Sequence, residues 1–158
     1  MRLILLFTLL VCPLISFAQN CDDVPEHNLQ IVKLAKSKMR KRVGRGECWD
    51  LAQYVLDKTE SKWDGLYKYG RRINRQRECI MPGDIIQFER VKVRYQNGRY
   101  TVTESMAHHT AIVYDVSNQN EIRLIHQNTA ETGRRVGISS LNFEHVISGR
   151  MKIYRPVR

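Results

Sequence analysis

Within nine residues, Val43-Gly44-Arg45-Gly46-Glu47-Cys48-Trp49-Asp50-Leu51, the chain changes from a glycine-containing loop into an amphipathic segment. Apolar side chains then recur at helical spacing, which predicts a helix over residues 48–59. Unpaired backbone N–H groups and the helix dipole stabilise a thiolate at a helix N-terminus, so Cys48 is a candidate nucleophile. Asp50 points away from the thiol at this spacing and is interpreted as a charge that favours the helix start. The simpler alternative is that Cys48 is a small buried apolar residue.

The flanking residues predict a second helix and then a change to strands. Residues 26–42 alternate apolar and basic side chains at helical spacing, and the glycines after them end that segment. Residues 63–79 are polar, basic and glycine-containing, which indicates an irregular connection. After Met81-Pro82-Gly83-Asp84 the apolar residues alternate with a period of two, and Asn97-Gly98 between two such runs is typical of a type I′ hairpin.

The order of these elements predicts the fold class. Strands are expected on both sides of the hairpin turn, and then at residues 109–116, 121–128, 134–138 and 149–155. Two helices followed by five or six antiparallel strands indicate an α+β domain in which the helices pack on a sheet. The sequence has no internal repeats or low-complexity linkers, so residues 19–158 are expected to form a single domain.

The first 18 residues have the pattern of a signal peptide. Arg2 supplies the positive charge, residues 3–15 form an apolar core that is short for a membrane span, and Ser16-Phe17-Ala18 offers small residues for cleavage. We therefore expect a secreted or periplasmic protein, cleaved near Ala18, with no transmembrane segment afterwards. The alternative is a retained N-terminal anchor.

Cleavage would leave three cysteines, Cys21, Cys48 and Cys79. An odd number of thiols in an oxidising compartment suggests one disulfide and one free thiol. Cys21 and Cys79 are the expected pair because each lies in a loop-like stretch just before a regular element. That pairing would leave Cys48 free to react, whereas three reduced thiols are the alternative.

The charge of the chain favours anionic partners. The sequence holds 26 Lys and Arg against 16 Asp and Glu, a net charge of +10, and the basic residues are densest at 33–45 and 71–77. Neither cluster interleaves aromatic residues in a pattern that reads bases, so we expect attraction to peptidoglycan or another anionic envelope polymer and no nucleic acid. We also expect a monomer without a cofactor.

Histidines on the predicted strands are candidate bases for the thiol. His108 and His109 are adjacent, so only one of them can face the helices, and the alternation alone does not choose between them. His126 and Asn128 are two residues apart on the next predicted strand, and either could orient an imidazole. A zinc site built from Cys48, His109 and His126 is the alternative, but the spacing typical of zinc ligands is absent.

Four short blocks, in order, resemble the CHAP and NlpC-type cysteine peptidases of the papain-like superfamily. The block Gly46-Glu47-Cys48-Trp49-Asp50-Leu51 is similar to their nucleophile segment, and Met81-Pro82-Gly83-Asp84-Ile85-Ile86-Gln87-Phe88 to their Pro-Gly-Asp strand opening. His109-Thr110-Ala111-Ile112-Val113 is similar to their histidine strand, and Leu124-Ile125-His126-Gln127-Asn128 to the strand that carries the third residue. His126 departs from the acidic residue usual in CHAP domains and agrees with NlpC-type enzymes.

The resemblance implies roles for these residues. Cys48 would attack a carbonyl, His109 would take its proton, and His126, helped or replaced by Asn128, would orient His109. The implied reaction is cleavage of an amide or peptide bond, most plausibly in peptidoglycan. The alternatives are a non-catalytic protein of this fold that binds cell-wall fragments or a partner, and a secreted antibacterial effector with the same chemistry.

Overall fold

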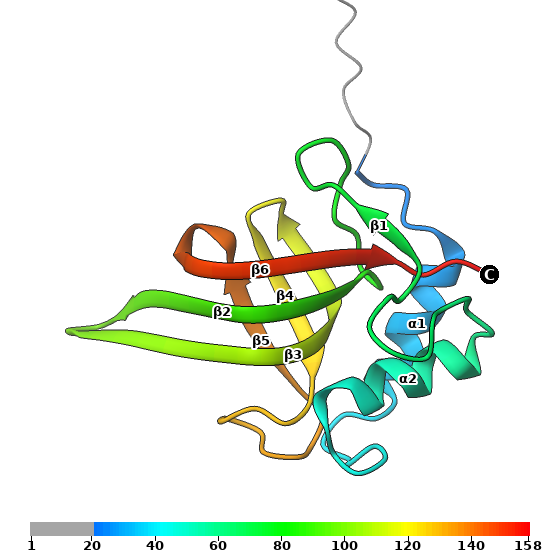
Figure 1. Cartoon of the computed structure of the whole chain (residues 1–158), viewed down its shortest axis with the longest axis horizontal. Coiled ribbons are helices and arrows are strands. Elements are labelled where there is room, and N and C mark those ends of the chain that lie inside the picture. The colour runs from blue at the N-terminus through cyan, green and yellow to red at the C-terminus, as the bar shows by residue number, and fades with distance from the viewer. Residues whose placement is uncertain (1–20) are drawn as a thin grey trace, which may run out of the picture.

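The computed structural model describes residues 21–158 and has an α+β architecture (Figure 1). Two helices, α1 (Glu26–Lys36) and α2 (Cys48–Lys58), precede a sheet of six antiparallel strands in the order β1-β6-β2-β3-β4-β5. The strands are β1 (Arg71–Ile73), β2 (Ile85–Asn97), β3 (Tyr100–Asn118), β4 (Glu121–His126), β5 (Gly137–Asn142) and β6 (Val146–Arg155), with a 3₁₀ turn, η1 (Phe143–His145), before β6. The predicted fold class is thereby confirmed, while the predicted signal peptide lies outside the described residues.

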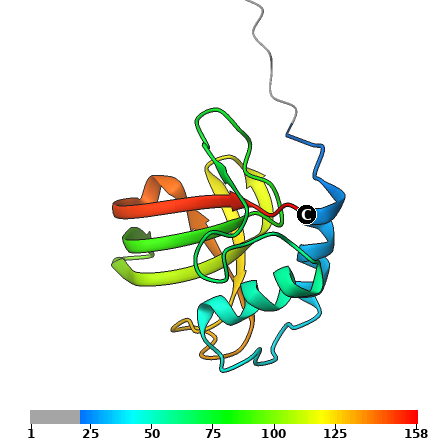
Figure 2. The same cartoon turned by 45° about the vertical axis from the view of Figure 1, so that its right-hand side comes forward.

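Both helices pack on one face of the sheet, as Figure 2 shows. The buried side of α2 meets apolar side chains of β2, β3 and β4, among them Ile85, Ile112 and Ile125. The predicted bounds of α2 are close to those observed. The first helix is shorter than residues 26–42, because the chain leaves it to run beside Val136: the N–H of Arg40 donates to the Val136 carbonyl at 2.9 Å.

The other face of the sheet encloses a second apolar cluster. Phe88, Ala111, Val113 and Leu124 belong to it, and η1 adds Phe143. In both views β4 and β5 pass behind β2 and β3, so the sheet is strongly curved around this cluster (Figures 1 and 2). Alternation along β3 therefore sends Ile112 towards the helices and its neighbours Ala111 and Val113 away from them.

The strands differ from the expected ones at several places, among them β4, which ends at residue 126 and not 128, and β6, which begins at residue 146 and not 149. The hairpin arm and the histidine strand are one continuous strand, β3, and β2 pairs with it up to Asn97 opposite Tyr100. The expected irregular connection contains the short strand β1, which pairs only with β6. The fifth strand spans Gly137–Asn142 and not residues 134–138, because residues 134–136 turn back against the segment after α1.

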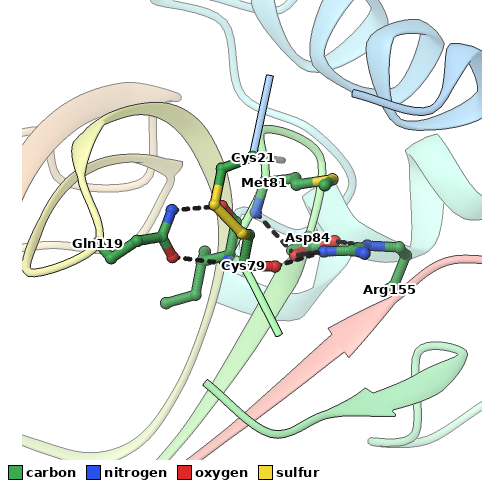
Figure 3. The surroundings of a disulfide bond; sticks show 7 residues. Cys21, Cys79, Met81, Asp84, Gln119 and Arg155 are labelled. Carbon is green, nitrogen blue, oxygen red and sulfur yellow. Dashed lines mark hydrogen bonds and ion pairs between the residues drawn. A yellow bond between two sulfur atoms is a disulfide. The ribbon is translucent and has the colours of Figure 1, made fainter. Parts of the chain in front are cut away.

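A disulfide joins Cys21 to Cys79, which confirms the expected pairing (Figure 3). Next to it, Arg155 at the end of β6 donates to both carboxylate oxygens of Asp84, at 2.9 and 2.8 Å, and to the Cys79 carbonyl at 2.7 Å. The amide of Gln119 holds Ile80 from the other side, accepting from its N–H and donating to its carbonyl. This corner therefore fastens the N-terminal segment to the first residues of β2.

The Pro82-Gly83-Asp84 segment has a structural role at the same corner. Gly83 has a φ of +85°, and a Cβ there would lie 2.5 Å from the Asn28 carbonyl oxygen of α1. Only glycine combines that backbone conformation with so close an approach. The Asn28 side chain in turn donates to Asp84 at 3.0 Å, so this short motif locks α1 onto the start of the sheet. Among residues 21–158 no helix is long and apolar enough to cross a membrane.

Candidate active site

The loop that leads into α2 is held by the side chain of Gln127, which is fully buried directly after β4. Its Oε1 accepts from the Val43 N–H at 3.1 Å, and its Nε2 donates to the carbonyls of Val43 at 3.0 Å and Glu47 at 2.7 Å. Asp50 completes the turn, because its Oδ2 accepts from the N–H groups of Arg45 and Glu47. These contacts fix the position at which the helix begins, and Asp50 is the helix-start charge that the sequence predicts.

Cys48 is the first residue of α2 and carries a free thiol that is partly buried. Burial raises the thiol pKa, and the Glu47 carboxylate adds to that effect. The backbone N–H groups of Thr110, Trp49 and Cys48 itself act in the opposite direction but are weaker. The expected lowering by the helix N-terminus is thus present and is outweighed, so the net pKa lies above the ordinary value. Thr110 is the residue of β3 among the groups that act on the thiol pKa, so the sulfur lies near that strand; His109, whose side chain lies on the other face of β3, is not one of those groups.

His109 and His126 are directly connected on the concave side of the sheet. His109 lies opposite Phe88 in the β2–β3 pairing and packs beside its ring, and its Nε2 is 2.9 Å from Nδ1 of His126. The Nε2 of His126 is in turn 2.9 Å from the hydroxyl of Ser139 on β5. The structure therefore places three polar side chains from three adjacent strands in one hydrogen-bonded chain, His109–His126–Ser139.

The imidazoles of His109 and His126 are both neutral near pH 7. Burial lowers the pKa of His109 to about 4, and burial together with the neighbouring His109 lowers the pKa of His126 to about 3. Two proton arrangements satisfy the hydrogen bonds. If His109 donates from Nε2 and His126 donates to Ser139, then Nδ1 of His109 keeps a free lone pair and can accept a proton. The reverse arrangement would leave a proton on that nitrogen.

Asn128 is not part of the hydrogen-bonded series His109–His126–Ser139. β4 ends at His126, and Asn128 follows it with a φ of +62°, so the expectation that the two residues share a strand face is wrong. Its Nδ2 donates to the Glu47 carboxylate at 3.0 Å, which places it beside the nucleophile loop. His108 lies on the opposite face from His109 and forms a T-shaped ring contact with Tyr67, with 4.5 Å between the ring centroids.

A buried polar cluster lies under Thr110, on the helix side of the sheet. The Tyr69 hydroxyl donates to Gln87 Oε1 at 3.1 Å and is 3.0 Å from the Thr110 hydroxyl, which also donates to Gln87 at 2.7 Å. Burial raises the Tyr69 pKa, so the phenol stays protonated. Because the Thr110 N–H acts on the thiol pKa of Cys48, this cluster fixes a residue next to the nucleophile.

Sequence reasoning missed three residues of the site: Gln127, Ser139 and Tyr69. Gln127 is two residues beyond the apolar Ile125, and this spacing could have shown that both point to the same side of the strand. Ser139 and Tyr69 carry no local signal, because their roles depend on strand pairing and on a loop path. The residues described in the structure include no group of three or more His, Cys, Asp or Glu side chains placed to bind a metal ion.

A family profile agrees with this architecture. The profile described as the AIM3/BBC1 Cysteine proteinase-fold domain matches residues 27–158. A solved structure described as the crystal structure of Ly7917 is similar at 14% identity, with a TM-score of 0.46 over 80% of this chain and 62% of that chain. This chain therefore spans less than two thirds of the length of that protein. No curated protein matches. The profile supports the papain-like fold expected from the sequence.

Proposed function

The chain belongs to the AIM3/BBC1 cysteine proteinase-fold domain family, and on that premise we propose that it is a cysteine hydrolase of the CHAP or NlpC type. The observation that carries the proposal is the hydrogen-bonded pair of His109 and His126, in which His109 precedes Thr110, the residue whose backbone N–H acts on the Cys48 thiol. A nucleophile, a base and a group that orients the base are the parts required for covalent acyl transfer.

In the proposed reaction, Nδ1 of His109 takes the thiol proton as the Cys48 sulfur forms a bond to the carbonyl carbon of the substrate. The carbonyl π electrons move to oxygen, and the resulting oxyanion is stabilised by backbone N–H groups at the start of α2, including that of Cys48. The tetrahedral intermediate then collapses. The C–N bond breaks, the imidazolium protonates the leaving amine, and a thioester to Cys48 remains.

Hydrolysis of the thioester completes the cycle, and His109 again acts first as the base and then as the acid. His109 removes a proton from a water molecule whose oxygen attacks the thioester carbonyl, the C–S bond breaks, and the proton returns to sulfur. His126 accepts from Nε2 of His109 throughout and donates to Ser139, which holds His109 in the tautomer that leaves Nδ1 available. His126 is thereby a positioning residue, as the resemblance implies.

The protonation states favour a neutral resting pair. The pKa of Cys48 is raised and the pKa of His109 is lowered. At neutral pH the resting state is therefore a neutral thiol and a neutral imidazole, and not a thiolate–imidazolium ion pair. Proton transfer would then accompany attack on the substrate, so His109 acts as a general base. This differs from a pre-formed thiolate, which the helix N-terminus alone would favour.

We propose that the substrate is an amide or peptide bond of peptidoglycan, cleaved outside the cytoplasm by the protein after removal of its leader. The Cys21–Cys79 disulfide supports an oxidising compartment. The net charge of +10 supports an anionic envelope polymer as the surface on which the enzyme acts. A monomer without a cofactor is sufficient for this chemistry, because every proposed catalytic group comes from one chain.

Digestion of purified peptidoglycan tests the proposal. The mature protein is incubated with the polymer beside Cys48→Ala, His109→Ala and the matched control His108→Ala, and the products are identified by mass spectrometry. We expect new amine and carboxylate ends with the unmodified protein and with His108→Ala, and none with the other two. Equal, inert product profiles for all four proteins would contradict the proposal for this polymer.

The raised thiol pKa supports one alternative, a non-catalytic protein of the same fold that binds wall fragments. Sedimentation with insoluble peptidoglycan separates the two. Binding that persists in all variants without any cleavage would establish the binding protein.

A further inference from the structure

Two arginines from distant parts of the chain lie side by side at the entrance to α2. Gly46 has a φ of +87°, and a Cβ there would be 2.7 Å from Cβ of Arg134 and 3.1 Å from Cδ of Arg42. Both side-chain stems therefore cross the same glycine, two residues before Cys48. The absence of a side chain at Gly46 gives the two arginines room to lie together.

The backbone holds the two loops that carry these arginines in register. The N–H of Arg40 donates to the Val136 carbonyl, and the N–H of Val136 donates to the Lys41 carbonyl, each at 2.9 Å. Figures 1 and 2 show the two loops beside the N-terminal end of α2. The backbone positions from which the two side chains start are thus fixed by the framework.

Little negative charge within the described chain neutralises this pair. Arg134 has an ion pair with the Glu47 carboxylate at 3.5 Å, while Arg42 has no carboxylate partner among residues 21–158. Glu47 is already engaged, since its other oxygen accepts from Asn128. Further exposed basic residues on the same two loops are Arg40, Lys41, Arg45 and Arg135. Adjacent like charges are stabilised by an anion between them.

We propose that Arg42 and Arg134 bind a carboxylate of the substrate beside the bond that Cys48 attacks. A guanidinium matches a carboxylate with two parallel hydrogen bonds, and two guanidinium groups can engage both oxygens of one acid. This inference rests on the proposed function and narrows its substrate to a peptide with a free acid group next to the scissile amide. The two arginines are specificity-determining residues and take no part in bond breaking.

Alkylation of Cys48 tests the charge of this entrance without any need for hydrolysis. Iodoacetate carries a carboxylate, whereas iodoacetamide is neutral and nearly the same size. The ratio of their rates at one pH cancels the thiolate fraction and the exposure of the sulfur. We expect this ratio to fall by about fivefold in the double variant Arg42→Gln/Arg134→Gln, which corresponds to the loss of about 1 kcal/mol of charge attraction in water. The ratio of the unmodified protein should also fall at high salt.

Two control variants accompany that measurement. Arg99→Gln removes an equal kind of charge at the exposed turn between β2 and β3, and should leave the ratio unchanged. Arg42→Lys/Arg134→Lys keeps the charge, so it should keep most of the preference for iodoacetate, and it serves as the folded reference if the glutamine variant loses stability. An unchanged ratio in folded Arg42→Gln/Arg134→Gln, or an equal fall in Arg99→Gln, would overturn the proposal.

Peptide substrates separate this inference from the proposed function. We expect faster cleavage of wall peptides with a free carboxylate than of their carboxamide forms, and loss of that preference in Arg42→Gln/Arg134→Gln. Cleavage without such a preference would refute the carboxylate site alone. A charge-dependent alkylation ratio with no cleavage of either form would refute the proposed function and leave the anion-binding entrance in place.

Discussion

Replacing Gln127 by Met should loosen the start of α2 while leaving the sheet intact. Met has nearly the same length as Gln and no hydrogen-bonding amide. The change therefore removes the three hydrogen bonds from Gln127 to Val43 and Glu47 without opening a large cavity. Cys48 follows Glu47 directly, so its thiol is the natural reporter of the loosened segment.

The size of the effect follows from those three hydrogen bonds. A hydrogen bond contributes about 1 kcal/mol net, and a buried group left without a partner costs about 1–3 kcal/mol. Gln127 is fully buried, so the freed backbone groups of Val43 and Glu47 gain water only if the loop moves. We expect a loss of about 3–5 kcal/mol in the free energy of unfolding, a large part of the stability of a domain of this size.

A matched control is available in Gln119. Its side chain also holds both backbone groups of one residue, accepting from the Ile80 N–H at 2.8 Å and donating to the Ile80 carbonyl at 3.2 Å. Ile80 directly follows Cys79 of the disulfide, and Figure 3 shows Gln119 beside that bond. Gln119→Met should therefore cost about 2 kcal/mol from its two hydrogen bonds and leave the alkylation rate of Cys48 unchanged.

Urea denaturation and the rate of iodoacetamide modification, measured on both variants, check the prediction. Gln127→Met should lower the urea midpoint more than Gln119→Met does and change the Cys48 rate under native conditions. If Gln127→Met unfolds at the same urea concentration as the unmodified protein, or leaves the thiol as reactive as before, Gln127 does not hold the loop and the reasoning fails.

Three further outcomes are expected. The folded-state pKa values of about 4 for His109 and about 3 for His126 lie below the ordinary 6.5, so the unfolded chain binds more protons and stability should fall as the pH drops from about 6.5 towards 3. Urea midpoints at pH 7 and pH 5 should therefore differ less in His126→Asn than in the unmodified protein; an equal fall in both would argue against a buried neutral His126. The alkylation rate of Cys48 should rise with a midpoint above 9.0, and a midpoint below 7 would indicate a thiolate–imidazolium pair instead. Removing the disulfide, which spans 58 residues, by a paired Cys21→Ser/Cys79→Ser change should cost about 4 kcal/mol, whereas an unchanged melting temperature would show that it contributes nothing to stability.

Much of the fold was predictable because its signals are local. The change of apolar period from helical to alternating at residue 85, and the Asn97-Gly98 turn, depend on neighbouring residues alone. The short strand β1 escaped prediction because its partner, β6, is far along the chain and its three residues are mostly exposed. The shortened α1 has a similar cause, because the residues after it pair with Val136, which is far along the chain.

The candidate site was likewise predictable only where its signals are local in the sequence. The position of Cys48 at a helix start could be predicted, and the resemblance selected His109 and His126, which the structure joins by a hydrogen bond. The sequence could not rank burial of the thiol against the backbone N–H groups that favour the thiolate, because burial depends on packing from other elements. Asn128 was misplaced because a left-handed residue after β4 leaves no trace in the alternation of side chains.

The place of β6 in the sheet bears on how the chain acquires its structure. It is the last strand along the chain, yet it lies between β1 and β2, and β1 has no other partner. A growing polypeptide can form α2 and the β2–β3 hairpin early, but the sheet cannot close until residues 146–155 are inserted. Until then two strand edges stay open to other chains. The fold is therefore completed only when β6 has been added. A chain truncated before β6 would expose those strand edges to chaperones and proteases.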